Sequence, residues 1–308
     1  MMKSNVRRGL CILIVTVLLT GLLPTTARAD MGPKPSIRVT FEGMGEELCY
    51  ATLLSREEST GPYSALSPRE MSPYGSPSYA TEPEDLANRA FTYYEDADGF
   101  YFLQILWQVN ETKELAWTYY PPSEFKILLY YPQRDLFVSS GSYERYAFDS
   151  YYTVDMTDFS LPQGDAQPGL LAAEELRAET SYDYTWEVLS LLARIGLTIL
   201  VELAVALLFG FRKKELVFLA WVNVGTQVVL NVLLNVINYM AGQLAFMAGY
   251  MLLEILVFIL EAVLYCTLME KVTRQPRSGW YCIGYALVAN VASYITGYEL
   301  ARLIPGIF

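Results

Sequence analysis

The chain has 308 residues, 53% of them hydrophobic, and a formal net charge of −11. The negative charge is concentrated between residues 30 and 183, where 26 acidic and 10 basic residues argue against nucleic acid or anionic lipid as a partner. The absence of histidine removes the usual proton shuttle, zinc ligand and triad base, and no other motif predicts a catalytic residue, a metal site or a cofactor.

Residues 1–29 have the three parts of a cleavable secretory signal peptide. Three basic residues among the first eight form the charged head, residues 10–23 form the apolar stretch, and residues 27–29 read A-R-A, an A-x-A cleavage site. An uncleaved anchor helix is the alternative, although the apolar stretch is short for a span of about 20 residues. We expect the mature protein to begin at Asp30, outside the cytoplasm.

Residues 30–155 alternate apolar and polar side chains with the period of two that marks half-buried strands. The runs lie at residues 36–42, 48–54, 101–109, 115–119, 125–131, 136–139 and 146–154. Short strands separated by turns predict an all-β extracytoplasmic domain, an immunoglobulin-like β-sandwich, although barrels give the same pattern. Cys49 is the only cysteine in this region, so the domain must fold without an internal disulfide.

Two polar segments interrupt the β pattern. Residues 55–90 are dense in serine, proline, glycine and charge, and they predict a long loop with a helical turn at residues 83–91. Residues 156–185 predict a linker that contains a short helix. Between them, residues 95–99 read EDADG, which fits a tight Asp-Gly turn better than a fragment of a calcium loop.

Tyrosine pairs recur through the predicted exported domain. They lie at Tyr93-Tyr94, Tyr119-Tyr120, Tyr130-Tyr131 and Tyr151-Tyr152. In a strand, one ring of each pair faces inward and the other faces outward. The outward rings suit a surface for a ligand or an envelope protein, because tyrosine offers a flat apolar face and a hydroxyl. Ordinary strand-surface tyrosine is the alternative interpretation.

Four apolar segments in residues 186–308 predict a four-helix transmembrane domain. Each is long enough to cross a bilayer, and they lie at about 186–211, 216–237, 244–268 and 280–304. Basic residues gather in the loops 212–215 and 270–278, which the positive-inside rule places in the cytoplasm. The N-terminal domain and the C-terminus are then extracytoplasmic, in agreement with a secretory start.

The second apolar segment carries a line of amide side chains. Asn223, Gln227, Asn231 and Asn235 are four residues apart, so each is rotated by about 40° from the previous one, and Asn238 falls on the same side. An unpaired amide in hydrocarbon costs several kcal/mol. The amides are therefore expected to face neighbouring helices.

The other apolar segments supply polar partners for these amides. We expect one intramembrane polar site, formed by Glu202, Asn223, Gln227, Asn231, Asn235, Glu254, Glu261, Asn290 and Ser293. Insertion scales give about 2.5–3.5 kcal/mol for an acidic side chain at the centre of a bilayer. Three glutamates must therefore be protonated, paired with a cation or bonded to the amides. The site is either a structural contact between helices or a place for a cation or small polar solute.

The layout resembles that of bacterial membrane proteins in which a signal sequence precedes an exported domain, and no motif assigns a family. The leading hypothesis is a non-enzymatic envelope membrane protein: the β-domain binds a ligand or partner, and the helices hold a polar site for signalling or assembly. A second copy of the chain or another membrane subunit is a further expected partner. The alternative is a small cation- or proton-coupled transporter, or a transporter subunit, that uses the glutamates. A membrane enzyme is disfavoured, since the membrane segments contain no aspartate and the chain no histidine.

Overall fold

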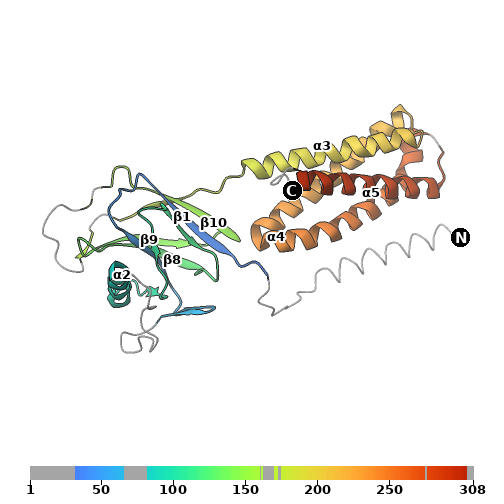
Figure 1. Cartoon of the computed structure of the whole chain (residues 1–308). Helices are drawn as coiled ribbons and strands as arrows, with labels where there is room; N and C mark the ends of the chain where they lie inside the picture. The colour runs from blue at the N-terminus through green and yellow to red at the C-terminus, as the bar shows by residue number, and fades with distance from the viewer. Residues whose placement is uncertain are drawn as a thin grey trace. The chain divides into compact units, whose positions relative to one another are not determined.

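The computed structural model describes residues 32–65, 82–159, 161, 170–172, 175–274 and 276–303. They form two compact units, a β-unit from Pro33 to Tyr182 and a helical unit that begins at Asp183 (Figure 1). The predicted signal peptide, residues 1–29, lies outside the described residues.

The β-unit contains two main sheets. The first has the strand order β12-β10-β1-β7, with β1 (Ser36–Glu42), β7 (Glu114–Trp117), β10 (Asp149–Asp155) and β12 (Ala178–Thr180). The second has the order β11-β9-β8-β2-β5, with β2 (Tyr50–Ser55), β5 (Tyr101–Phe102), β8 (Glu124–Tyr131), β9 (Leu136–Glu144) and β11 (Leu170–Leu171), and β6 (Trp107–Gln108) also pairs with β2. The short strands β3 (Ser59–Thr60) and β4 (Tyr63–Ser64) form a separate pair.

Alternating burial explains how the two sheets share one core. Ile37, Val39 and Phe41 of β1 are buried, and they pack in one cluster with Phe125 and Ile127 of β8 in the other sheet. The burial of β8 is nearly continuous, because its second face also packs against apolar side chains. A strand covered on both faces is expected to be largely apolar, and in residues 125–131 Lys126 is the one charged side chain.

Helix α2 (Glu82–Tyr93) supplies that second cover. Ala87 and Phe91 of α2 are fully buried, and they cluster with Leu128, Tyr130 and Phe137 of β8 and β9. The ring centroids of Phe91 and Tyr130 lie 6.0 Å apart in an edge-to-face arrangement. The predicted helical turn at 83–91 is thus three turns of helix that complete the layer over the second sheet.

The observed sheets differ from the predicted immunoglobulin-like sandwich. The structure does not show an immunoglobulin arrangement. Strand β1 pairs in parallel with β10, and β11 pairs in parallel with β9. The predicted strand 101–109 is divided into β5 and β6, with Gln104 at a φ of 59° between them. The predicted linker helix is also not found where the structure describes the linker: residues 178–180 form β12, an edge strand of the first sheet.

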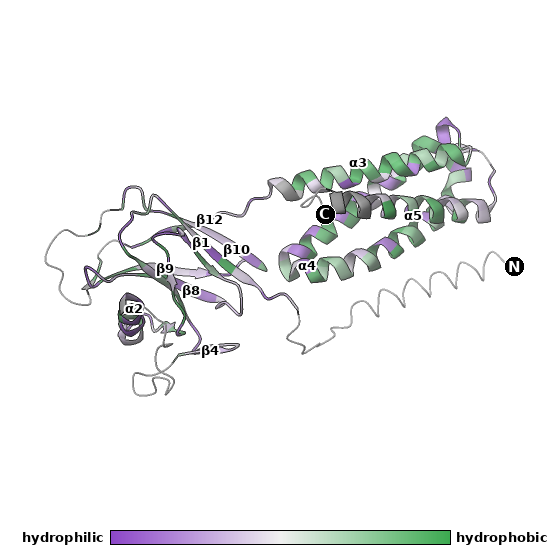
Figure 2. Cartoon of the chain, viewed as in Figure 1, coloured by the Kyte–Doolittle hydropathy of each residue, from purple (hydrophilic) through white to green (hydrophobic). Residues whose placement is uncertain are grey.

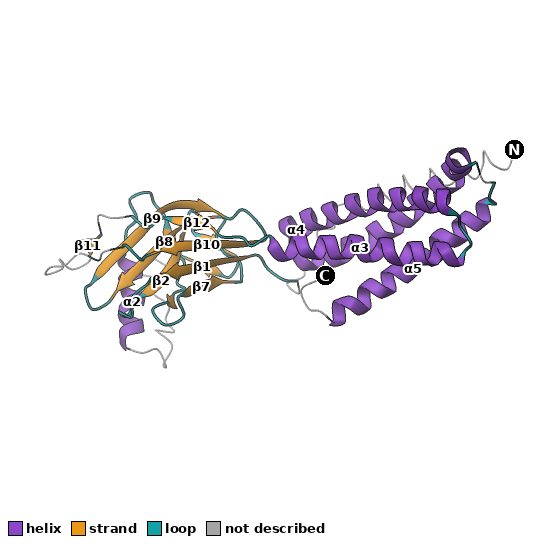
Figure 3. Cartoon of the chain, turned by 90° about the horizontal axis from the view of Figure 1, so that it is seen from above, coloured by secondary structure: helices purple, strands orange, loops and turns teal. Residues whose placement is uncertain are grey.

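Among the described residues, the helical unit has three helices where four were predicted: α3 (Thr185–Leu208), α4 (Lys213–Thr273) and α5 (Gly279–Leu303) (Figure 3). The predicted second and third segments are both in α4. A straight helix of its 61 residues would be about 90 Å long. Gly242, with φ 78° and ψ 179°, instead interrupts the helix, and Thr226 on one side hydrogen-bonds Glu261 on the other. Helix α4 therefore folds back on itself into two arms, which we call the first arm (213–241) and the second arm (243–273).

Two helices among the described residues are long and apolar enough to cross a membrane. They are residues 188–208 of α3 and the whole of α4. Figure 2 shows the apolar colouring along both. Only 17% and 22% of their most apolar windows is buried within the protein, and Leu200, Leu208 and Trp221 are among the exposed apolar side chains. Apolar helix surface of this kind needs an apolar surrounding.

One ion pair joins the ends of the helices. The fully buried carboxylate of Glu215, at the start of α4, accepts hydrogen bonds from Arg277 Nε at 2.8 Å and from the backbone amide of Arg212 at 2.7 Å. Arg277 also donates to the carbonyl oxygen of Gly210 at 3.2 Å. The connections that lead into α4 and α5 are thereby fixed to each other.

Replacing Gly242 with alanine tests the fold-back of α4. The backbone at Gly242 lies in a region that is open essentially to glycine alone, so we expect Gly242→Ala to destabilise the protein by about 1–3 kcal/mol. Gly225→Ala is the matched control, because an added methyl there meets no atom within 4 Å and alanine favours helix. Thermal unfolding in detergent, followed by circular dichroism, measures both; equal melting temperatures would contradict the assigned role of Gly242.

Candidate functional site

Two of the predicted polar residues, Glu261 and Asn290, are in direct contact in the helical unit. The carboxylate of Glu261, in the second arm of α4, is fully buried. Thr226 of the first arm donates its hydroxyl to Oε1 at 2.6 Å, and Asn290 of α5 donates its amide nitrogen to Oε2 at 2.8 Å. Both oxygens of one acid are thus satisfied by side chains from two other helical segments.

A second contact joins the two arms of α4 one turn away. The hydroxyl of Tyr265 donates to Asn223 Oδ1 at 2.5 Å, and both side chains are buried. Tyr265 lies four residues after Glu261, so the two side chains share a helix face. Sequence reasoning missed Tyr265 and Thr226, although this spacing of four gave a signal for Tyr265.

Glu202 of α3 lies in the same buried region with a different environment. Its side chain is fully buried, and neither carboxylate oxygen has a well-formed hydrogen bond among the described residues, although the side chains of Asn223 and Ser293 lie beside it. The hydroxyl of Tyr285 reaches only its backbone carbonyl, at 3.2 Å. Burying a polar group without a partner costs free energy, so this carboxyl group requires a physical explanation.

The remaining predicted residues line a small cavity beside this cluster. Gln227, Asn231, Glu254 and Ser293 line it together with Arg194, and its volume of about 10 Å³ is enough for about one water molecule. The amide nitrogen of Asn231 donates to the carbonyl oxygen of Gln227 at 2.8 Å.

The amides farthest along the first arm lie at the edge of this region. Asn235 is half-buried and accepts a hydrogen bond from Arg194 at 3.4 Å. Asn238 is also half-buried. The rotation of about 40° at each step of four residues carries the line of amides gradually off the buried face. Arg194 also lines the small cavity together with Glu254.

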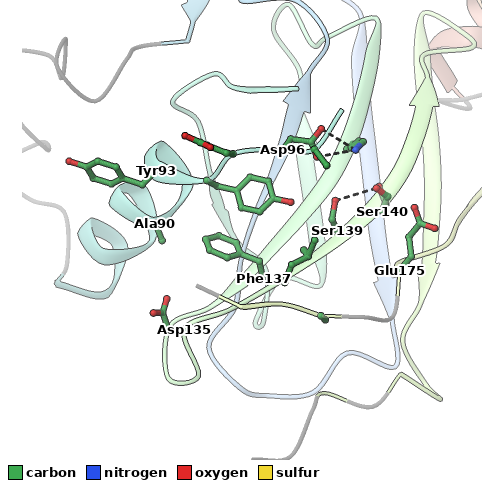
Figure 4. Close-up of a pocket in the computed structure, with 14 residues that line it drawn as sticks. Ala90, Tyr93, Asp96, Asp135, Phe137, Ser139, Ser140 and Glu175 are labelled. Atoms are coloured by element: carbon green, nitrogen blue, oxygen red, sulfur yellow. Dashed lines mark hydrogen bonds and ion pairs between the residues drawn. The ribbon is translucent and has the colours of Figure 1, made fainter. Parts of the chain in front are cut away.

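The β-unit holds a second candidate site, a pocket of about 570 Å³ (Figure 4). One wall is aromatic: Tyr93, Tyr94 and Phe137 line it, with the rings of Tyr94 and Phe137 4.8 Å apart. Residues from α2, β8, β9 and the segment after β11 complete the lining. Because these elements are distant in sequence, the strand pattern alone gave no signal for the pocket.

A buried ion pair forms the polar floor of this pocket. Lys126 Nζ lies 2.9 Å from Asp96 Oδ1, and the two side chains are only 8% and 3% exposed. Lys126 also donates to Asp98 at 2.5 Å. Burial lowers the pKa of Lys126, but hydrogen bonds to Asp98 and Asp96 outweigh it and raise the pKa above 10.5. The lysine therefore stays charged inside the domain.

The EDADG segment is the turn that presents these acids. Gly99 has a φ of 75°, and its amide donates to the carbonyl oxygen of Asp96 at 3.0 Å. The backbone amides of Asp98 and Phe100 donate to the Asp96 carboxylate. The two carboxylates that suggested a calcium loop are bonded to Lys126, and the segment has the geometry of the tight turn.

Acidic groups outnumber basic groups in the pocket. Glu95, Asp96, Asp135 and Glu175 line it, against Lys126 alone. The hydroxyl of Tyr130 donates to Asp135 at 2.8 Å. A methyl group added at Gly141 would lie 3.1 Å from Glu175 Oε1, so the glycine leaves room for this carboxylate. The pocket combines an aromatic wall with a negative potential.

Comparisons with protein-family models, with curated proteins and with solved structures gave no match. The function must therefore be inferred from the two sites themselves.

Removing Lys126 tests the buried ion pair. Lys126→Met leaves the Asp96 carboxylate buried without its cation, which we expect to destabilise the β-unit by about 3–5 kcal/mol. The matched control is Arg38→Met, which breaks a pair with Glu114 whose side chains are 41% and 40% exposed, with an expected effect of less than about 1 kcal/mol. Denaturant unfolding followed by tryptophan fluorescence measures both, and similar losses for the two variants would refute the distinction.

The acid side of the pH profile tests Asp98. Its hydrogen bond to Lys126 and the lysine's charge lower the pKa of Asp98 below 3.8. The folded state therefore binds this proton more weakly than the unfolded chain, so the stabilisation is present above pH 3.8 and is lost as the pH falls through the folded pKa. We expect wild type to be more stable than Asp98→Asn at neutral pH, with the difference vanishing in acid. A difference that persists in acid would contradict this linkage.

Proposed function

We propose that this chain is a non-enzymatic membrane protein of the cell envelope. Its β-unit lies outside the cytoplasm and binds a small ligand, and its helical unit spans the bilayer and holds the buried Glu/Asn site for signalling or assembly. The observation that carries the proposal is the pocket of about 570 Å³ beside the buried Lys126–Asp96 pair. Typical ligand sites have volumes of about 300–1,000 Å³ and few polar groups in an apolar lining.

The helical unit supports a place in the membrane. Helix α3, the two arms of α4 and helix α5 give four crossings in this proposal. The basic residues at 212–214 and 271–277 fall at one end of these crossings, where the ion pair of Glu215 and Arg277 also lies. The positive-inside rule assigns that end to the cytoplasm, which puts the β-unit and the C-terminus on the other side.

The pocket's charge and shape support an organic cation as the ligand. Lys126 is already neutralised by Asp96 and Asp98, so Glu95, Asp135 and Glu175 leave the pocket with excess negative charge. The rings of Tyr93 and Tyr94 provide faces that attract a cation. An amine or a quaternary ammonium compound with an apolar part matches both features.

The transporter hypothesis is retained as a second candidate. The observation that favours it is the Glu202 carboxyl, which is fully buried with unpartnered oxygens among the described residues. Ionisable groups inside membrane segments are characteristic of ion and proton pathways.

Ligand binding is tested on the purified full chain in detergent. We expect choline or spermidine to raise the melting temperature, whereas succinate and glucose leave it unchanged. Glu175→Gln should weaken cation binding about tenfold, as expected for a lost charged contact of about 1.4 kcal/mol. The matched control, Glu144→Gln, changes an exposed acid at the end of β9 that does not line the pocket and should have no effect.

Titration calorimetry gives the dissociation constants. Equal binding by wild type and Glu175→Gln would place the cation elsewhere. Binding of succinate in preference to choline and spermidine would overturn the organic-cation proposal.

A further inference from the structure

We propose that Glu202 binds a proton and that Glu202 and Glu261 form a proton-binding pair in which Glu261 keeps the negative charge. This inference deepens the proposed functional site of the helical unit. It does not depend on the pocket of the β-unit, so ligand binding there can fail while the proton site stands, and the reverse.

The buried cluster around Glu202 has more unpaired acceptors than unpaired donors. In the buried cluster, three acceptor oxygens lack a partner among the described residues: both carboxylate oxygens of Glu202 and Oδ1 of Asn290. Only one donor of the cluster, Nδ2 of Asn223, is unpaired. The ionised cluster therefore has two acceptors more than it has donors, and it calls for a species that supplies positive charge or hydrogen.

One proton on Glu202 removes this imbalance. It converts one carboxylate oxygen into an O–H donor, which leaves two donors, the acid hydroxyl and Asn223 Nδ2. Two acceptors remain, the second oxygen of Glu202 and Asn290 Oδ1. A protonated carboxyl has one donor and retains acceptor capacity, so the numbers of donors and acceptors become equal.

Glu261 is the member of the pair suited to remain ionised. Its two oxygens are bonded to the hydroxyl of Thr226 and the amide nitrogen of Asn290. Hydrogen bonds donated to both oxygens favour the charged form of a carboxylate. A proton placed on Glu261 would disturb these contacts and would leave Glu202 as a buried charge without a well-formed hydrogen bond.

The groups around Glu202 also favour a neutral Glu202 beside an ionised Glu261. Glu202 on α3 interacts electrostatically with Glu254 and Glu261, both from α4. Tyr265 of α4 bonds Asn223, and Tyr285 of α5 donates to the Glu202 backbone carbonyl. Arg194 lies eight residues before Glu202 on the same helix, about 12 Å along the axis. A proton neutralises Glu202 where its closest charged neighbours are other carboxylates.

The small cavity gives this proton a route of exchange. Ser293 adjoins Glu202 and also lines the cavity with Arg194 and Glu254. The Ser293 hydroxyl donates to the carbonyl oxygen of Asn290 at 3.0 Å, and its oxygen is left to accept a further hydrogen bond. Polar groups of three helices thus connect the two acids.

Infrared difference spectroscopy on the full chain tests the proposal. At neutral pH, wild type should show the carbonyl band of a protonated carboxylic acid that Glu202→Gln lacks. Glu261→Gln should keep that band and lose carboxylate absorption instead. No acid band assigned to Glu202, or an acid band lost in Glu261→Gln and kept in Glu202→Gln, would overturn the proposal, as would a Glu202 carboxylate band that shifts on addition of sodium ions.

Stability supplies a second, independent readout. Glutamine offers the same one donor side and one acceptor side as a protonated glutamate, so Glu202→Gln should keep the wild-type melting temperature. Glu202→Leu leaves the amide atoms of Asn223 and Asn290 unpaired and should melt several degrees lower. If Glu202→Gln lowers the melting temperature as much as Glu202→Leu, the neutral state of Glu202 is refuted.

Labelling of the wild type covers the case in which a variant does not fold. A hydrophobic carbodiimide reacts with protonated carboxyl groups in apolar surroundings. Mass spectrometry should find the adduct on Glu202 and not on Glu261, in an amount that falls as the pH rises. Preferential modification of Glu261, or protection of Glu202 by sodium ions at constant pH, would contradict the assignment.

Discussion

A carboxylate that is removed from water must find hydrogen-bond donors within the protein, and Glu261 finds them on two other helical segments. Thr226 and Asn290 reach its two oxygens from the first arm of α4 and from α5. In an apolar surrounding the unpaired alternative costs several kcal/mol, so these contacts specify how the helices pack as well as stabilising them. The requirement for internal partners therefore joins the two arms of α4 and helix α5 at Glu261.

The same constraint shapes the β-unit, with a different solution. Asp96 is almost fully buried, and its partners are Lys126 and the backbone amides of its own turn. Lys126 keeps its positive charge there because it is hydrogen-bonded to the carboxylates of Asp96 and Asp98. The helical unit uses neutral donors around Glu261 instead. The two buried acids are thus stabilised in different ways, one by a charged side chain and the other by neutral donors.

The sequence predicted those parts of the fold that depend on the spacing of side chains within a single helix or strand. Of the amides spaced four apart, Asn223, Gln227 and Asn231 are buried and Asn235 is half-buried, and the alternation in β1 indicated its inward side chains. The sequence placed a break between residues 237 and 244, and the structure narrows that break to Gly242, which the sequence pattern did not single out. Thr226 was overlooked because its partner, Glu261, is 35 residues away. The pocket of the β-unit was equally hidden, since α2, β8 and β9 come together only through tertiary packing.

The reversal of α4 at a single residue has a mechanical consequence. With no loop between the arms, the chain has no slack there, and neither arm can slide along the other without distorting Gly242. The contacts of Thr226 with Glu261 and of Asn223 with Tyr265 add two crosslinks to this hairpin. The two arms of α4 are therefore held in one register, with Glu261 and Asn223 on the faces where the arms meet.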